Sequence, residues 1–141
     1  MNHNLKLESI INRFMDDDTL MLITKDHNNI NSGNFIVKGK NHLTYKYISL
    51  WRDNLQKKYN YIGDQDKPSL INMILNTDFK KYVKLIDQSI INSYPNILIN
   101  KNSKIYKTND LLIHYAGYNW NNINFYNNMK SNFFESLEAN M

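Results

Sequence analysis

The stretch that decides the fold runs from residue 19 to residue 38 and reads Thr-Leu-Met-Leu-Ile-Thr-Lys-Asp-His-Asn-Asn-Ile-Asn-Ser-Gly-Asn-Phe-Ile-Val-Lys. Two apolar runs of strand length, Thr19–Thr24 and Gly33–Lys38, flank a polar segment. Short apolar runs bounded by Asn, Asp and Gly are typical of buried strands that follow one another in the chain. The sequence therefore predicts two consecutive strands with a polar turn over Asp26–Asn29 between them.

Helical and extended segments alternate around this pair of strands. Apolar residues at helical spacing predict helices, and short apolar runs predict further strands. Pro95 holds Tyr94 extended, so Gln88–Pro95 is predicted as a loop. The alternation predicts one α/β layered domain over residues 1–141. The expected helices are Leu5–Phe14, His42–Lys58, a segment from near Pro68 to Asn76, and Ile123–Leu137, and the further strands are Tyr82–Ile86 and Leu111–Tyr115, the latter ending at Ala116-Gly117.

The composition excludes several classes of protein. The chain has 141 residues, of which 42% are hydrophobic and 21% charged, as in ordinary globular domains. It has no cysteine, which excludes a disulfide framework, a thiol nucleophile and cysteine-based metal sites. The longest strongly apolar run, Leu20–Ile23, is far shorter than the roughly 20 residues of a membrane span. No signal peptide is visible, so we expect a soluble protein that is cytoplasmic by default.

The net charge of +4 favours anionic partners in general. It suits a nucleic acid, a nucleotide-sugar diphosphate or an anionic surface equally well. Arginine, which makes most specific base contacts, is nearly absent, so nucleic acid is the least favoured partner. Two basic clusters close to tyrosines nevertheless resemble single-strand binding sites: Lys80, Lys81 and Lys84 near Tyr82, and Lys101, Lys104 and Lys107 near Tyr106.

Five polar or small residues carry the candidate chemistry. The amide of Asn31 can donate and accept at once, which suits a sugar hydroxyl, and Gly33 lets the backbone approach a ligand closely. Without further information, the same pair is also an ordinary Asn–Gly turn. Asp64 and Gln65 lie between two predicted helices, where they could orient a sugar, act as a base or cap a helix. His114 ends a predicted strand, where open α/β sheets place ligands, although a half-buried structural histidine is common there.

Four local patterns occur in a fixed order along the chain: Lys25–Val37, Asp64-Gln65, Ile91-Asn92-Ser93-Tyr94 and Asn109–Gly117. Together they resemble the catalytic domain of glycosyltransferase family 34. These GT-A enzymes move galactose, mannose or xylose from a nucleotide sugar. In that family an Asp and then Asn-x-Gly precede an apolar strand, and an Asp/Glu-Gln loop, an Asn-Ser-Tyr segment and an Asp-x-x-x-His-x-x-Gly ending follow. The resemblance covers roughly Leu20 to Gly117.

The resemblance implies a role for each candidate residue. His114 is expected to bind Mn²⁺ near the diphosphate, and Gly117 to leave room for the phosphates. Asn31 and Gly33 are expected to bind the sugar, and Asp64 is the first choice for the acidic active-site residue, with Gln65 beside it. The implied substrates are a nucleotide sugar carrying a hexose or pentose and a glycan acceptor with a free hydroxyl.

One part of the family pattern is missing from its usual place. The family's Asp-x-Asp metal motif normally lies well upstream of the Asn-x-Gly strand. Asp16-Asp17-Asp18 has that spacing but follows a helix, and we interpret it as a solvated helix-end loop. The expected fold is therefore a partial GT-A (nucleotide-diphospho-sugar transferase) fold, a mixed sheet flanked by helices without the N-terminal nucleotide-binding part. A second chain or a homo-oligomer could complete it; the alternative function is an inactive transferase remnant that acts as a binding or partner domain.

Overall fold

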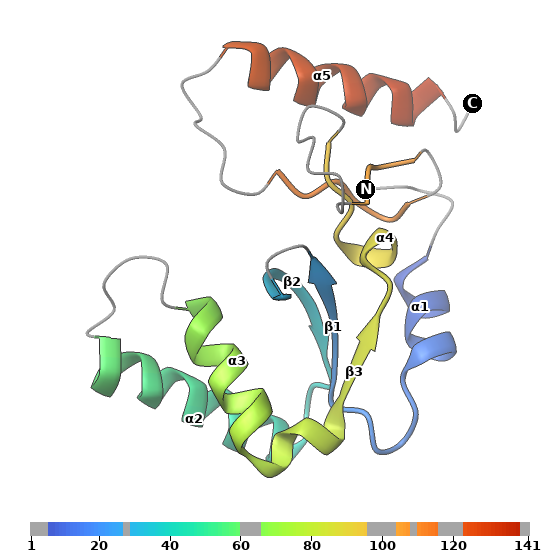
Figure 1. Cartoon of the computed structure of the whole chain (residues 1–141). Coiled ribbons are helices and arrows are strands. Elements are labelled where there is room, and N and C mark those ends of the chain that lie inside the picture. Colours follow the sequence, from blue (N-terminus) through green and yellow to red (C-terminus); the bar gives the residue numbers. More distant parts are fainter. Residues whose placement is uncertain are drawn as a thin grey trace.

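The computed structural model describes residues 6–26, 29–59, 66–95, 104–107, 110–115 and 123–138. A three-stranded sheet lies at its centre in the order β2-β1-β3 (Figure 1). The central strand β1 (Met21–Asp26) pairs antiparallel with β2 (Asn29–Val37) and parallel with β3 (Val83–Ile86). The predicted mixed sheet is confirmed, and β2 begins four residues earlier than predicted.

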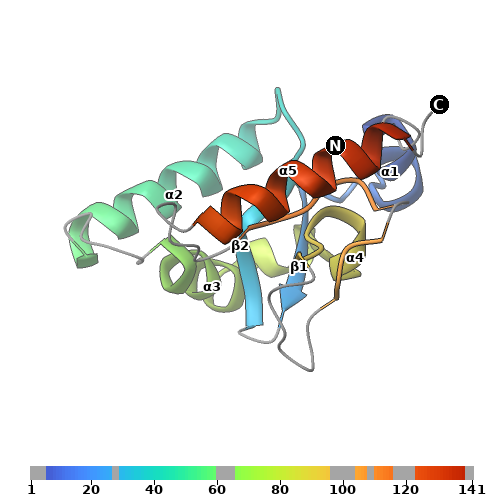
Figure 2. The ribbon, with the colours of Figure 1, turned by 90° about the horizontal axis from the view of Figure 1, so that it is seen from above.

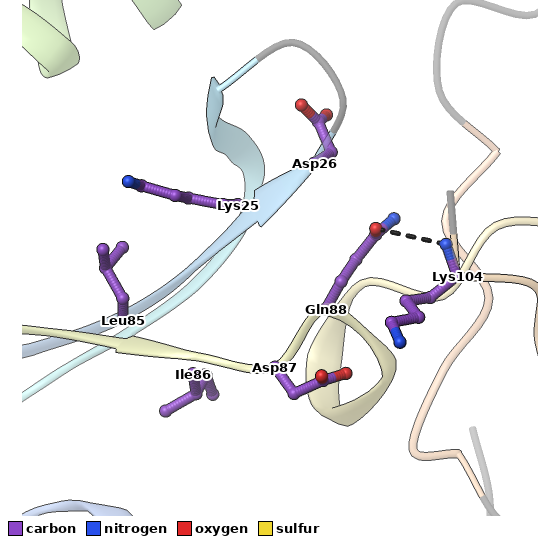
Figure 3. Close-up of a pocket in the computed structure, with 7 residues that line it drawn as sticks. All are labelled: Lys25, Asp26, Leu85, Ile86, Asp87, Gln88 and Lys104. Atoms are coloured by element: carbon purple, nitrogen blue, oxygen red, sulfur yellow. Dashed lines mark hydrogen bonds between the residues drawn. The ribbon is translucent and has the colours of Figure 1, made fainter. Parts of the chain in front are cut away.

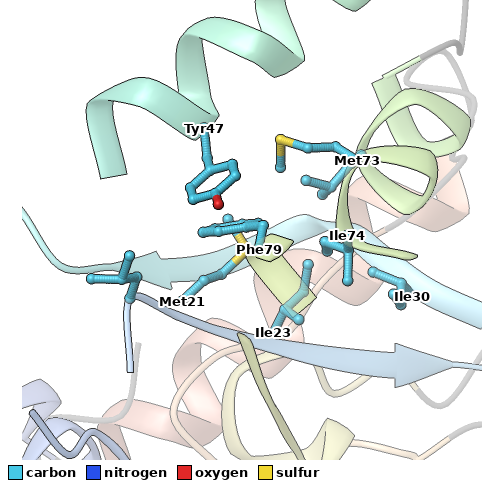
Figure 4. Packing of buried hydrophobic residues seen from close by; sticks show 9 residues of the cluster. Met21, Ile23, Ile30, Tyr47, Met73, Ile74 and Phe79 are labelled. Atoms are coloured by element: carbon cyan, nitrogen blue, oxygen red, sulfur yellow. The ribbon is translucent and has the colours of Figure 1, made fainter. Parts of the chain in front are cut away.

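The central strand is apolar because both of its faces are covered. Met21, Leu22 and Ile23 are all fully buried, as expected for a strand between two layers. Met21 and Ile23 join a core cluster on one face, and Leu22 joins a second cluster on the other. The first cluster is built around a Tyr47–Phe79 ring contact with centroids 4.4 Å apart (Figure 4).

The helices lie on both faces of the sheet, which confirms the flanked arrangement. The first cluster is covered by α2 (His42–Tyr59), α3 (Asp66–Asn76) and the 3₁₀ helix η1 (Asp78–Tyr82). The second is covered by α1 (Leu7–Phe14) and α4 (Gln88–Ile91). The last helix, α5 (Ile123–Glu138), crosses beyond the carboxyl ends of β1 and β3 (Figures 1 and 2).

Two predicted elements are wrong. The segment predicted as a loop contains α4, a single helical turn whose N-cap Asp87 accepts hydrogen bonds from the Ser89 backbone N and hydroxyl at 2.9 and 2.7 Å. Leu111–Tyr115 is not a strand and makes only one parallel bridge, Ser93↔Ile113. The segment that it pairs with, around Ser93, is too short to form a strand. It lies between the end of α4 and Pro95, which has no N–H to donate to a sheet.

The acidic run Asp16–Asp18 joins no group of metal-ligating side chains among the described residues. Asp16 accepts hydrogen bonds from the Thr19 backbone N at 2.8 Å and hydroxyl at 2.5 Å, and it forms an exposed ion pair with Lys84 at 3.5 Å. These contacts lower the pKa of Asp16, with the Thr19 hydroxyl making the largest contribution. The run therefore builds the turn at the amino end of β1, opposite the carboxyl end where Asn31 lies.

Candidate functional site

A bulge in β2 turns three residues out of the sheet. Ile23 pairs with Phe35 and the next residue, Thr24, pairs with Asn31, so residues 32–34 have no partner on β1. Bulges bend a strand and redirect its side chains, often beside a ligand site. Here the bulge brings Gly33 and Asn34 against residues from the far end of the chain.

A buried polar network lies beside the bulge. The side chain of Asp26 is only 2% exposed, and its Oδ2 accepts hydrogen bonds from Asn31 Nδ2 at 2.6 Å and from the Tyr94 hydroxyl at 2.7 Å. Asn31 Nδ2 also donates to the Tyr94 oxygen at 2.8 Å, and its Oδ1 accepts from Gly33 N at 2.7 Å. Both amide hydrogens of Asn31 are therefore used in hydrogen bonds to Asp26 and Tyr94. Its Oδ1 already accepts one hydrogen bond, which leaves one lone pair that could accept from a ligand.

Tyr94 remains a neutral phenol in this network. Burial, the hydrogen bond to Asp26 and the charge of that carboxylate all raise the pKa of Tyr94 far above its usual value. The hydroxyl therefore acts as a donor to Asp26 and an acceptor for Asn31.

His114 is held on two sides. Its ring Nδ1 lies 2.5 Å from Asn92 Oδ1, and its backbone N donates to Ser93 O at 2.7 Å. The ring packs near Tyr94 with centroids 5.7 Å apart. Its Cε1–Nε2 edge lies against Gly33, where an added Cβ would be 2.1 Å from Cε1 and 2.7 Å from Nε2. Glycine is therefore required at residue 33 for the imidazole to occupy this position. The group that closely approaches the Gly33 backbone is a side chain of the same protein.

The segment Asn92-Ser93-Tyr94 connects the first and the last of the four sequence patterns. Asn92 contacts His114, Ser93 Oγ donates to Asp110 Oδ2 at 2.6 Å, and Tyr94 donates to Asp26. All three are buried. Three consecutive residues thus fix residues that are far apart in the sequence into one site.

The start of α3 is anchored at the same place. Ser32 Oγ donates to Asp66 Oδ2 at 2.7 Å, the Trp51 indole N–H donates to Asp66 O at 3.2 Å, and Lys67 Nζ lies 3.7 Å from Asp26 Oδ1. Asp64 and Gln65, the two residues before Asp66 in the chain, lie outside the described residues, as does Gly117.

A cavity of about 490 Å³ opens at the carboxyl ends of β1 and β3 (Figure 3). Asp26 lines it from β1, and Asp87 and Gln88 line it at the start of α4. The side chain of Gln88 points toward Lys104 and accepts a hydrogen bond from its backbone N at 3.3 Å. A ligand in this cavity would be next to the Asp26 network, at the sheet edge where α/β proteins place ligands.

The predicted site residues that the structure describes lie together. Asn31 and His114 both lie within 3 Å of the position that a Cβ on Gly33 would occupy. No role was predicted for Asp26, Asn92 and Tyr94, although all three stand within the quoted patterns. Their place in those patterns was the available signal, because Asp26 precedes Asn-x-Gly and Asn92 and Tyr94 belong to the Asn-Ser-Tyr segment.

A bound metal would need ligands in addition to His114. In the described ranges no three His, Cys, Asp or Glu side chains are arranged to hold a metal ion. His114 could supply one nitrogen ligand through Nε2. Its other ring nitrogen, Nδ1, already contacts Asn92 Oδ1, as is usual for metal-binding histidines. The remaining ligands would come from the substrate or from groups outside the described residues.

The imidazole of His114 is expected to be neutral at pH 7. Burial lowers its pKa from 6.5, and the nearby Asp26 carboxylate opposes this only in part. As the pH falls through 6.5, His114 becomes protonated in the unfolded chain while it stays neutral in the folded chain. Because the unfolded state then binds more protons, the free energy of unfolding should decrease. An NMR titration of the His114 Hε1 signal, assigned with a His114→Gln variant, should give a midpoint below 6.5. A midpoint at or above 6.5 would contradict the burial of the ring.

The comparisons with known proteins identify the class. A sequence model of a glycosyltransferase family matches residues 2–123, which is most of the chain. The chain belongs to the galactosyl transferase GMA12/MNN10 family. This confirms the family predicted from the four patterns. Neither a curated protein nor a solved structure gave a significant match.

Within the described segments, no helix combines the length and the apolar character needed to cross a bilayer.

Proposed function

We propose that this chain is part of a GT-A glycosyltransferase that transfers a hexose or pentose from a nucleotide sugar to a glycan hydroxyl. Membership of a glycosyltransferase family supports the class of reaction. The observation that carries the proposal is the convergence of Asn31, Gly33 and His114 at the carboxyl end of the sheet. Such convergence of polar groups beside a cavity is the usual form of a small-molecule site.

His114 is proposed to bind Mn²⁺ through Nε2. Manganese accepts imidazole together with carboxylate and phosphate oxygens, and the metal would neutralise the leaving diphosphate. Two features of the chain suit the imidazole to this role: burial favours its neutral form, and its Cε1–Nε2 edge lies against Gly33, which has no side chain.

Asn31 is proposed to shape the sugar site more than to bind the sugar through its amide hydrogens. Those hydrogens are bound to Asp26 and Tyr94, and Asn31 Oδ1 holds the backbone N of Gly33. The bulge, and with it the surface presented to the donor, therefore depends on Asn31.

Asp64 and Gln65 are proposed to act on the donor sugar or the acceptor. Their position in the chain supports this, because the next two residues contact Ser32 and Asp26. A carboxylate at this point could stabilise positive charge that develops on the sugar in the transition state.

The nucleotide-binding part of the GT-A fold is proposed to join the sheet at β3. Within the described residues β3 is an edge strand, and its Leu85 is 48% exposed. Exposed edge strands readily accept another strand. That strand could come from a second chain or a second copy of this one.

The test is calorimetric titration of UDP and GDP into the purified protein, with and without Mn²⁺. We expect metal-dependent binding of one nucleotide, lost in His114→Ala because the imidazole that lies against Gly33 is removed. His42→Ala changes an exposed histidine on α2 and serves as the matched control. No binding to the folded wild type would contradict a donor site in this chain and favour the role of an inactive partner domain.

A further inference from the structure

The side chain of Asn92 is completely buried and is held from several directions. Its Oδ1 faces His114 Nδ1 at 2.5 Å and accepts from Asn34 Nδ2 at 3.1 Å. Its own carbonyl accepts from Gln88 Nε2 at 3.0 Å, and its backbone N donates to Gln88 O at 2.8 Å. A side chain fixed to this degree can impose a hydrogen-bonding pattern on its neighbour.

The direction of the hydrogen bonds can be followed from Asp26. An ionised carboxylate only accepts hydrogen bonds, so the Tyr94 hydroxyl must donate to Asp26. The lone pairs of the Tyr94 oxygen are then directed away from Asp26 and can accept from other donors. The Asn92 side chain also acts on Tyr94 and opposes the rise of its pKa, as an N–H near the phenol oxygen does. Among the described residues, Asn92 Nδ2 has no hydrogen-bond partner. Asn92 Oδ1 accepts from Asn34 Nδ2, and the amide is therefore oriented with this oxygen toward His114.

We propose that Asn92 is a positioning residue that holds neutral His114 in the tautomer with hydrogen on Nδ1, so that Nε2 keeps the free lone pair beside Gly33. An amide oxygen accepts and never donates, so the ring nitrogen facing it must carry the hydrogen. A free imidazole in water does not have this constraint. The hydrogen bond to Asn92 therefore selects which ring atom is able to bind a ligand.

The consequence for catalysis rests on the proposed function, whereas the tautomer does not. If His114 binds Mn²⁺, only the nitrogen without hydrogen can do so, and that atom lies on the ring edge that faces Gly33. Groups behind a metal-binding histidine typically change metal affinity by 10–100-fold when removed.

The tautomer is measured on the metal-free protein by long-range ¹H–¹⁵N correlation of the histidine ring at pH 8. In the wild type, Nδ1 of His114 should have the ¹⁵N shift of a protonated nitrogen and Nε2 that of a bare one. Asn92→Leu removes the acceptor and should shift the ring toward the Nε2–H form. Asn92→Asp keeps an acceptor oxygen and should restore the wild-type pattern. Backbone spectra check that each variant is folded.

The outcomes of these measurements separate the two proposals. A wild-type ring with hydrogen on Nε2, or an unchanged ring in folded Asn92→Leu, would overturn the role of Asn92. If Asn92→Leu does not fold, Asn92→Asp and the wild-type tautomer alone decide. The expected tautomer with no Mn²⁺-dependent nucleotide binding would leave Asn92 as the residue that orients His114 and would count against the donor site. With a working donor site, Asn92→Leu should weaken Mn²⁺-dependent binding by about 10–100-fold, and Asn92→Asp only slightly.

Discussion

Replacing Gly33 with alanine is expected to reduce Mn²⁺-dependent nucleotide binding by roughly 100-fold, because displacing a binding group by about 1 Å has effects of this size. The new Cβ would lie 2.1 Å from His114 Cε1, 2.7 Å from His114 Nε2 and 2.9 Å from Asn31 Oδ1. The ring cannot simply turn away, because its Nδ1 is bound to Asn92 and its backbone N to Ser93. The variant must therefore give up the position of the imidazole or the shape of the bulge.

The chain contains a matched control for this substitution. Gly39→Ala makes the same chemical change where an added Cβ has no heavy atom within 4 Å. Binding, measured by calorimetry, should be normal in Gly39→Ala and roughly 100-fold weaker in Gly33→Ala, with both proteins folded by circular dichroism. Normal binding by folded Gly33→Ala would show that the contact between Gly33 and His114 has no part in the site.

Replacing Asp26 with alanine is expected to lower the free energy of unfolding by about 3 kcal/mol. The carboxylate is nearly inaccessible to water and accepts hydrogen bonds from Asn31 and Tyr94. Its removal leaves these two donors without their acceptor and leaves Lys67 without its anion. Urea denaturation followed by circular dichroism measures the loss.

An exposed carboxylate supplies the comparison. Asp53 pairs with Arg52 at 3.0 Å, but both side chains are largely in solvent, so Asp53→Ala should cost less than about 1 kcal/mol. Asp26→Asn keeps the size of the side chain and one acceptor oxygen, and its loss should be intermediate. Equal stabilities of Asp26→Ala and Asp53→Ala would contradict the buried network.

Local sequence patterns predicted the helices and strands that depend mainly on neighbouring residues. The apolar run before Asp26 became β1, and the helices over residues 42–59 and 123–138 agree with the predicted ones within one residue at each end. The short helix α4 escaped prediction because four residues are too few for a helical period. The predicted strand at Leu111–Tyr115 failed because strand formation depends on a partner, and its partner ends at Pro95.

The candidate site was predictable only in part. The spacing of Asn31 and Gly33 and the position of His114 marked residues that do lie together. The roles of Asp26 and Tyr94 were not visible, because their hydrogen bond joins residues 68 positions apart. No local rule specifies such a pairing. It emerges once β3 pairs with β1 and delivers the following segment to the bulge.

The topology also sets the order in which the site can be assembled during synthesis. The β1–β2 hairpin joins neighbouring parts of the chain, whereas β3 must pair Val83 with Met21. Contacts between distant residues form late, because closing a long loop costs entropy before any contact is gained. A growing chain on the ribosome can therefore complete the hairpin while Asp26 still faces water without Tyr94. His114 is the last of these site residues to be synthesised, so its contacts can form only after Asp26 and Tyr94 are already in the chain.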